Sequence, residues 1–325
     1  MIITQTPLRI SFAGGGTDLA KFYKKYGGAV LSSGIDKYVF SIVKERFDED
    51  IYLNYMKKEI VGSLGEIQHE LIREAMKKAG VLSGVEITTL SDIPASGSGL
   101  GSSSSITVAL LQSLYLHAGK IVDAETLARD ACEIEIDILG GPIGKQDQYI
   151  AAHGGLNIFE FNADGSVVVI PIQINTDDLN YLSSCLMLFY TGKTRSANTI
   201  LTEQSKNINK KISIMKQMKA QVYILKEAFE KKNFDYLGES LDAGWELKKQ
   251  LAGGVSNPEI DDMYKKAKKG GALGGKIAGA GGGGFLLLYV PLKNQSKVRS
   301  VLKKYREIPF TLSRDGSKSI FNIRR

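Results

Sequence analysis

The chain has 325 residues, of which 43% are hydrophobic and 24% are charged, as is ordinary for a globular protein in water. Its net charge of +7 favours anionic ligands in general. Many of the lysines surround the apolar positions of one predicted helix at 206–232, with no aromatic-laced basic strand beside them. Nucleic-acid binding is therefore not expected.

Localisation and redox state follow from simple absences in the sequence. No apolar run approaches about 18 residues, and the chain starts with a strand-like segment instead of a signal peptide, so we expect a cytoplasmic protein with no membrane partner. Cys132 and Cys185 are expected to be reduced, buried thiols. The three histidines show no zinc-ligand spacing.

Hydrophobic periodicity predicts the following elements in chain order. The expected strands span 2–10, 30–33, 38–44, 51–55, 85–90, 157–161, 167–170, 185–190, 285–290 and 320–323. The expected helices span 19–26, 66–79, 106–116, 123–139, 206–232, 234–251, 259–269 and 296–304. Loops are expected at 34–37 and 172–184. Strands gather early and do not strictly alternate with helices, which predicts an α/β (α+β) protein without a plain doubly wound sheet.

The length predicts two domains, 1–180 and 181–325, the second completed by the last helix and strand. Between an expected strand and an expected helix, residues 94–105 read Pro-Ala-Ser-Gly-Ser-Gly-Leu-Gly-Ser-Ser-Ser-Ser. The glycines remove side chains that would hold a ligand off the backbone, and the serines stand where helix N-caps belong. A helix start attracts anions, so this stretch predicts a polyphosphate site. The alternative, a flexible linker, would not lead directly into an apolar helix.

Several charged residues near other glycine-rich turns have both a functional and a structural interpretation. Arg9 could pair with a carboxylate or a phosphate, or be an ordinary strand-end cation. Asp18 could bind a sugar hydroxyl or cap a helix. Asp147 could act as a base whose charge Lys145 balances, or cap a helix. Glu135 could bind magnesium or face solvent.

Two further segments allow similar pairs of interpretations. Lys193 and Arg195, close to the start of the long basic helix, could bind a second anion or be solvated cations. The glycine-rich run at 270–284 implies close backbone packing or the approach of a ligand.

Three glycine-rich stretches, at 7–18, 94–103 and 276–284, resemble the signature motifs of the GHMP kinase superfamily in their order and spacing. The resemblance covers essentially the whole chain. It implies a ribosomal-protein-like N-terminal domain and a ferredoxin-like C-terminal domain, with ATP and substrate in the cleft between them. It also implies Mg²⁺ as a cofactor, held by Ser103 and Glu135.

The resemblance implies further roles residue by residue. Asp147 matches the family's catalytic aspartate, with Arg9 or Lys145 balancing charge on the transferred phosphoryl group. The residues that would bind ATP are Pro94, Gly97, Gly99, Leu100, Gly101, Ser102, Ser103 and Ser104. The residues that would bind the substrate are Gly14, Gly15, Gly16, Thr17, Asp18, Lys193, Arg195, Gly281 and Gly282.

The runs at 9–18, 144–149 and 191–195 look like the heptose 7-phosphate kinase branch of this family. That implies phosphorylation of the anomeric hydroxyl of D-glycero-D-manno-heptose 7-phosphate, to give the 1,7-bisphosphate in GDP-heptose synthesis. Lys193 and Arg195 would then hold the substrate's phosphate, Arg195 in a bidentate manner. Galactokinase-like members carry Glu and His at the positions of Gly15 and Gly16, which argues against galactose.

Two alternatives stay open at this point. One is a fucokinase-like enzyme that acts on an unphosphorylated sugar, and the other is a catalytically silent protein that binds sugar or ATP. Ser103, Glu135 and Asp147 occurring together argue against the silent protein. The sequence does not fix the oligomeric state, and a homodimer is one expectation.

Overall fold

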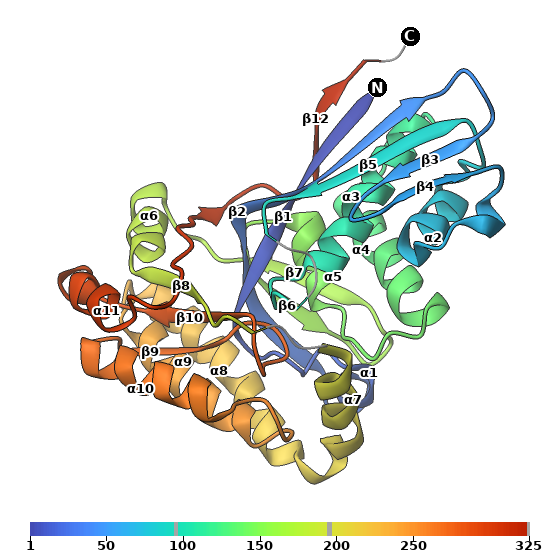
Figure 1. Cartoon of the computed structure of the whole chain (residues 1–325). Coiled ribbons are helices and arrows are strands. Elements are labelled where there is room, and N and C mark those ends of the chain that lie inside the picture. Colours follow the sequence, from blue (N-terminus) through green and yellow to red (C-terminus); the bar gives the residue numbers. More distant parts are fainter. Residues whose placement is uncertain (94–96, 194–196, 324–325) are drawn as a thin grey trace.

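The computed structural model describes residues 1–93, 97–193 and 197–323 (Figure 1). Its larger sheet has the strand order β12-β1-β2-β5-β3-β4, with β11 and β6 also pairing with β2, and β7 with β6. These strands are β1 (Ile2–Ala13), β2 (Gly28–Glu45), β3 (Ile51–Asn54), β4 (Lys58–Val61), β5 (Val85–Ser91), β6 (Leu156–Phe161), β7 (Val167–Pro171), β11 (Leu312–Ser313) and β12 (Lys318–Asn322).

Strand β2 corrects one expectation from the sequence. The predicted loop at 34–37 is wrong, because β2 continues through these residues as one strand. The pairing of β1 with β2 shifts register after Pro7, and Ile35 then pairs with Leu8 and is fully buried. The local Gly-Ile-Asp-Lys sequence therefore forms an irregularity within the ladder and does not end it.

A smaller antiparallel sheet has the order β8-β10-β9 and consists of β8 (Leu186–Tyr190), β10 (Phe285–Tyr289) and β9 (Gly274–Ile277). Strand β9 lies in the glycine-rich run and is not among the strands that periodicity predicts. A Cβ atom at Gly274 would lie 1.8 Å from the carbonyl oxygen of Gly238, so this strand can pack on the neighbouring helix only as glycine. The glycines that make this segment look like a loop in the sequence are the residues that allow it to pack closely against α9.

The helices are α1 (Ala20–Tyr26), α2 (Glu70–Ala79), α3 (Ser102–His117), α4 (Ala124–Cys132), α5 (Gln146–His153), α6 (Thr176–Ser184), α7 (Ala197–Asn207), α8 (Ile212–Glu230), α9 (Tyr236–Lys249), α10 (Pro258–Gly270) and α11 (Gln295–Val301). Short 3-10 turns lie at Leu64–Glu66, Ile208–Lys210 and Leu292–Asn294. Figure 1 shows α8, α9 and α10 beneath the smaller sheet.

Three helical expectations need correction. The segment 123–139 is α4, capped by Asp123, followed by a π-helical turn at Glu133–Ile138. The basic segment 206–232 is not one helix, because the 3-10 turn separates α7 from α8. The expected loop at 172–184 holds only for residues 172–175, because Asn175 then caps α6 by accepting a hydrogen bond of 2.8 Å from the Asp178 amide.

The last strand does not belong to the smaller sheet. Strand β12 pairs antiparallel with β1, with Ile2 opposite Asn322, and β11 pairs with β2. Figure 1 shows β12 beside β1 at the top of the view. The expectation that the last strand completes the second domain is therefore wrong, and the boundary at residue 180 stays a prediction.

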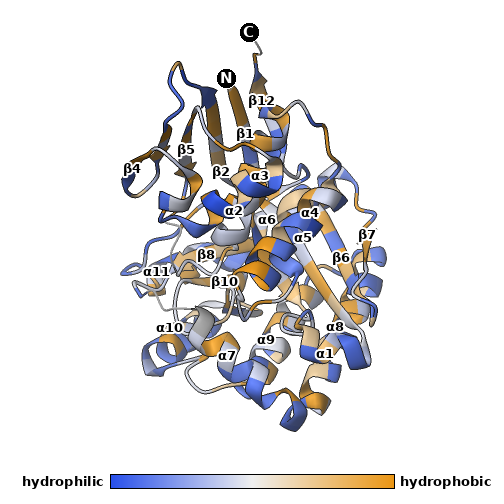
Figure 2. Ribbon diagram, turned by 90° about the vertical axis from the view of Figure 1, so that its right-hand side faces the viewer, coloured by the Kyte–Doolittle hydropathy of each residue, from blue (hydrophilic) through white to orange (hydrophobic). Residues whose placement is uncertain are grey.

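One hydrophobic core joins the two sheets. It includes Leu8 and Ile10 from β1, Leu188 and Leu287 from the smaller sheet, and Leu225 from α8. Figure 2 shows the hydrophobic colour along β1, β2 and β5. A shared core fixes the two sheets relative to each other and so fixes the groups that lie between them. Within the described part of the chain, every helix is too short or too polar to span a bilayer.

Candidate active site

A cavity of about 460 Å³ lies where the glycine-rich segments meet. Its walls come from β1, the turn after β1, the loop before α3, the start of α5, α9 and β9. Segments from the beginning, middle and end of the chain therefore line one space. A cavity of this size with several converging polar groups is the usual form of a small-molecule site.

Close backbone packing explains why glycines occur at this junction. A Cβ atom at Gly99 would lie 2.5 Å from the carbonyl oxygen of Ala278, and one at Gly279 would lie 2.6 Å from the Cα of Gly99. A Cβ atom at Gly284 would lie 2.4 Å from the carbonyl oxygen of Ser98. The second and third glycine-rich segments thus pack directly against each other, which side chains would prevent.

The start of α3 faces this cavity without a side-chain cap. The N-cap residue is Gly101 in the left-handed conformation, with φ of 78°, and no side chain caps the helix. The prediction that the serines serve as N-caps is therefore wrong. Their hydroxyls point elsewhere: Ser102 bonds to Ser98 at 3.0 Å, and Ser104 donates to Glu135 at 2.6 Å. An uncapped helix start whose first residues line a cavity suits a phosphate group.

Glu135 is buried and accepts hydrogen bonds on both carboxylate oxygens. Ser103 and Thr107 donate to Oε1 at 3.0 and 2.8 Å, while Ser104 and the amide of Gln148 donate to Oε2. Burial raises the pKa of Glu135, and these four donors oppose the rise. The alternative of a solvent-facing Glu135 is wrong, because only 4% of the residue is exposed.

These oxygens fit the ligand preference of magnesium. The Ser103 hydroxyl and the Glu135 carboxylate are hard oxygen donors that lie together at the cavity wall. Within the described residues, no group of three or more His, Cys, Asp or Glu side chains could hold a metal by itself. Mg²⁺ commonly uses one or two protein ligands and takes the remainder from substrate phosphates and water, so the donor set suits a metal that arrives with a nucleotide.

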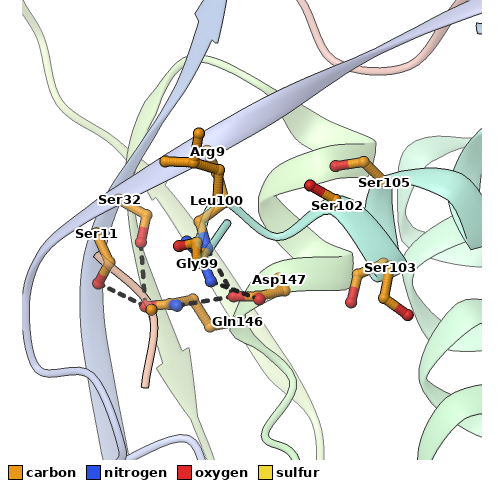
Figure 3. A network of polar contacts seen from close by, with 12 residues as sticks. Arg9, Ser11, Ser32, Gly99, Leu100, Ser102, Ser103, Ser105, Gln146 and Asp147 are labelled. Atoms are coloured by element: carbon orange, nitrogen blue, oxygen red, sulfur yellow. Dashed lines mark hydrogen bonds and ion pairs between the residues drawn. The ribbon is translucent and has the colours of Figure 1, made fainter. Parts of the chain in front are cut away.

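Arg9 and Asp147 form a bidentate ion pair inside the cavity (Figure 3). The distances are 2.7 Å from Nε to Oδ1 and 2.6 Å from Nη2 to Oδ2. The remaining guanidinium nitrogen Nη1 donates to the Gly99 carbonyl at 2.6 Å, which ties the pair to the loop before α3. Gln146 donates to Oδ1 at 2.9 Å and itself accepts from Ser11 at 2.7 Å.

The electrostatics of Asp147 favour its ionised form. Burial works to raise the pKa of Asp147, but the charge and hydrogen bonds of Arg9 outweigh it and lower the pKa. Its side chain is still 26% exposed, so a ligand in the cavity can reach it. Asp147 lies in the first turn of α5 but is oriented by Arg9 and Gln146, and it is not the N-cap residue of that helix.

Asp18 also lines the cavity, close to the start of α5. Its Oδ1 accepts from the Gly16 amide at 2.9 Å, and its Oδ2 accepts from the Gln146 amide at 3.2 Å. Burial and the nearby charge of Asp147 raise the pKa of Asp18. A Cβ atom at Gly144 would lie 2.0 Å from Oδ2, so glycine is required there for this contact.

In the turn after β1, some residues are packed inside the protein and others line the cavity. Gly14 and Thr17 do not line the cavity, and the Thr17 hydroxyl donates to the backbone carbonyls of Gly14 and Ala29 at 2.8 Å each. By contrast, a Cβ atom at Gly16 would meet no atom within 4 Å, and one at Gly15 would meet only Ser11, at 3.7 Å. Gly15 and Gly16 therefore leave free space at the cavity wall.

The structure directs several predicted binding residues away from the cavity. Lys145 donates to the Gly165 carbonyl at 2.6 Å, instead of pairing with Asp147. Lys193 forms an exposed ion pair of 2.6 Å with Glu259. Two other glycines, Gly281 and Gly282, pack on the backbone of Val255 and are not among the residues that line the cavity. Pro94 and Arg195 lie outside the described residues.

Two cavity cations are not predicted from the sequence. Lys248 on α9 and Lys276 on β9 line the cavity, and each is only 7% exposed. Lys248 resembles any other lysine of an amphipathic helix, and its neighbour Lys249 is partly exposed and pairs with Glu246. Lys276 does carry a signal, because it is a lone cation between glycines and an isoleucine shortly before a fully apolar strand.

Comparisons with known proteins agree with this geometry. Residues 66–155 match the GHMP kinases N terminal domain, and residues 225–308 match GHMP kinases C terminal. The chain is 33% identical to D-glycero-alpha-D-manno-heptose 7-phosphate kinase of Campylobacter jejuni, over 98% of both chains. It is 27% identical to an L-fucokinase/L-fucose-1-P guanylyltransferase of Bacteroides fragilis, covering 96% of this chain and 38% of that protein.

A solved structure gives the same result for the fold. The crystal structure of a D-glycero-D-manno-heptose 1-phosphate kinase from Bacteroides thetaiotaomicron aligns over 100% of both chains, with a TM-score of 0.83 and 27% identity. The sequence-based predictions of the family and of its two-domain fold are confirmed. The chain belongs to the GHMP kinase family and is an ATP-dependent kinase.

Proposed function

We propose that the protein transfers the γ-phosphoryl group of ATP to the anomeric hydroxyl of D-glycero-D-manno-heptose 7-phosphate, giving the 1,7-bisphosphate for GDP-heptose synthesis. The observation that carries phosphoryl transfer is the meeting of the uncapped α3 start, Glu135 and the Arg9–Asp147 pair in one cavity. The similarity to a heptose 7-phosphate kinase over the whole chain supports the choice of substrate.

Different residues would bind the nucleotide, hold the metal and orient the sugar hydroxyl. The ATP phosphates would lie on the amides at the start of α3. Ser103 and Glu135 would hold Mg²⁺, which neutralises charge on the β- and γ-phosphates when bound. Asp147 would accept a hydrogen bond from the sugar hydroxyl and take up its proton as the new oxygen–phosphorus bond forms and the bond to the ADP oxygen breaks.

Arg9 sets the state in which Asp147 works. Because the guanidinium holds the pKa of the carboxylate below its ordinary value, Asp147 is ionised and fixed in orientation before substrate binds. A carboxylate of this kind is a weak base, so its main contribution is to orient the hydroxyl toward the phosphoryl group. The roles proposed from the sequence for Lys145 and Lys193 gain no support from their contacts.

The free space at Gly15 and Gly16 supports a substrate larger than a hexose. Neither position meets backbone when a Cβ atom is added, so these two lining residues leave the cavity open beside the turn after β1. A heptose carries one more carbon than a hexose and needs such room. The fucokinase-like alternative stays open because of the similarity to the bifunctional fucokinase, which covers most of this chain.

The test is ³¹P NMR of the protein with MgATP and matched sugars. The panel contains D-glycero-D-manno-heptose, mannose and fucose, with heptose and mannose each tested with and without a terminal phosphate. We expect a new anomeric phosphate signal only with heptose 7-phosphate. Turnover of fucose alone would replace this substrate by the fucokinase alternative, and binding of MgATP without turnover of any sugar would favour the silent protein. The cytoplasmic location and the homodimer stay predictions.

A further inference from the structure

The lysine pair, Lys248 and Lys276, lies in the cavity without an anionic partner. Lys248 donates to the backbone carbonyls of Ile277, at 3.4 Å, and Gly279, and Lys276 donates to the Phe12 carbonyl at 3.4 Å. Within the described parts of the chain, neither ammonium group forms an ion pair with a carboxylate. Each group has three N–H donors, so donors remain for a ligand.

Burying such cations is costly unless an anion joins them. A buried lysine without a countercharge loses its hydration, and a second cation beside it adds repulsion. Burial, followed by the charges of Lys276 and Arg9, holds the pKa of Lys248 well below its ordinary value, although the charge of Asp147 acts in the opposite direction. Burial and Arg9 lower the pKa of Lys276 to about 7. The arrangement is thus unfavourable in the free protein.

The position of the pair links it to phosphate chemistry. Gly279, whose carbonyl binds Lys248, packs directly on Gly99 of the loop before α3. Lys276 lies on β9, two residues before Ala278, whose carbonyl also faces Gly99. The other charged groups of the cavity are Arg9, Asp18, Glu70, Glu135 and Asp147. Asp147 is already neutralised by Arg9 through two short hydrogen bonds.

We propose that Lys248 and Lys276 form an anion subsite for a phosphoryl group on the α9–β9 wall of the cavity. Two ammonium groups match the double negative charge of a phosphate monoester or of a terminal nucleotide phosphate. This inference rests on the proposed function in one respect, which is the choice of heptose 7-phosphate as the sugar ligand. The phosphoryl group can come from the γ-phosphate of ATP or from the terminal phosphate of the sugar.

Binding measurements with matched ligands distinguish these two sources. Lys248→Gln and Lys276→Gln are compared with wild type by calorimetry, using AMP-PNP, ADP, heptose 7-phosphate and heptose in the presence of Mg²⁺. A loss of roughly tenfold or more for AMP-PNP but not for ADP assigns the subsite to the γ-phosphate. A similar loss for heptose 7-phosphate but not for heptose assigns it to the phosphate of the sugar.

A matched control is Lys249→Gln, which removes the neighbouring lysine of α9 and leaves the cavity unchanged. We expect its affinities to equal those of wild type. If both cavity variants keep wild-type affinity for all four ligands, the proposal is overturned. A general loss for every ligand, including heptose and ADP, together with a lower melting temperature would also overturn it, because that pattern indicates a structural role.

Proton uptake gives a second readout that does not depend on turnover. An anion beside Lys276 raises its pKa, so the protein should take up protons on binding at pH 7.5. Calorimetry in buffers of different ionisation enthalpy measures this uptake, and Lys276→Gln should reduce it. Binding of every phosphorylated ligand without any proton uptake by wild type would contradict the proposal.

These outcomes separate the subsite from the proposed function. Turnover of heptose 7-phosphate with unaltered binding in both lysine variants would refute the subsite and leave the function intact. Failure to phosphorylate heptose 7-phosphate, combined with lysine-dependent binding of AMP-PNP, would refute the substrate and leave the subsite intact.

Discussion

The cavity contains two charged regions that are satisfied to very different extents. In the first, Arg9 and Asp147 neutralise each other through two hydrogen bonds of 2.7 and 2.6 Å. In the second, Lys248 and Lys276 contact only backbone carbonyls among their hydrogen-bond partners in the described residues. Burial disfavours charge in both regions, but in the first each charge has a partner that compensates for it, and in the second no such partner is within hydrogen-bond distance among the described residues.

The two regions differ in how their protonation states depend on a bound ligand. Arg9 lowers the pKa of Asp147 in spite of its burial, so the carboxylate stays ionised whether or not substrate is bound. Burial dominates the environment of the lysine pair and lowers both pKa values, and the charge of Asp147 opposes this only in part, at Lys248. The first region is preorganised for orientation of a hydroxyl, and the second responds to the arrival of charge.

Removing the carboxylate tests the first region and should have the largest effect. Asp147→Asn loses the charge that orients the sugar hydroxyl, and kcat should fall by about 10²–10⁴-fold with little change in AMP-PNP affinity. Steady-state kinetics and calorimetry measure the two quantities. Asp123→Asn is the control, because Asn replaces Asp well at the N-cap of α4. Wild-type turnover by Asp147→Asn would remove the residue from its proposed role.

The contact between the two regions can be broken at Gly99. Gly99→Ala would place a Cβ atom 2.5 Å from the Ala278 carbonyl at a φ of +74°, so we expect a loss of about 2 kcal/mol or more in the free energy of unfolding. Urea denaturation measures it. In the control Gly62→Ala, the added Cβ meets no atom within 4 Å, and the change should stay within about 0.5 kcal/mol. Equal stability of the two variants would show that this packing is not needed.

The second region predicts a pH dependence of stability. The folded-state pKa of Lys276 is about 7, below its unfolded value, so the unfolded chain binds more protons above pH 7 and wild-type stability should rise with pH. Relative to Lys276→Met, the free energy of unfolding of wild type should rise by about 2 kcal/mol from pH 7 to 9. Urea denaturation at each pH checks this. Parallel pH curves would mean that Lys276 is not held in a lowered-pKa state.

The smallest effect is expected for a lysine outside both regions. Lys193 pairs with Glu259 at the surface, and such exposed pairs contribute about 0–1 kcal/mol. Lys193→Ala should therefore leave the KM for heptose 7-phosphate close to that of wild type. A large rise in this KM would restore Lys193 as a ligand of the substrate phosphate, as the sequence resemblance implies.

Local signals in the sequence predict most helices and strands of the fold. The cap at Gly80, for example, ends α2 in the left-handed conformation, as expected for a glycine after a helix. The strand β9 could not be predicted in this way, because its glycines are explained by close packing against α9 at Gly274 and against β10 at Gly275. The placement of β12 beside β1 depends on contacts between the two ends of the sequence, which no local pattern reports.

The candidate site shows the same division between local and long-range information. Glu135 and Asp147 are carboxylates near glycine-rich turns, a local pattern that marks them as candidates but leaves a structural alternative open for each, and it is the family resemblance that implies their roles. The hydrogen-bond partners of these carboxylates are harder to predict from the sequence, because Arg9 and Asp147 are 138 positions apart. Lys248 and Lys249 have the same side chain and adjacent positions, yet only the first turns into the cavity. Burial of a single lysine depends on what packs beside its helix, and the sequence of that helix does not contain this information.

The pairing of β12 with β1 has a consequence for how the chain is made. Strand β1 leaves the ribosome long before its outer neighbour at Lys318–Asn322 is synthesised, because about 310 residues separate the two strands in the sequence. At roughly 5–20 residues per second, the edge of β1 stays unpaired for about 15–60 s after it emerges. During that time the exposed edge can pair with other chains, and β2 does not protect it, because β2 covers the opposite edge of β1.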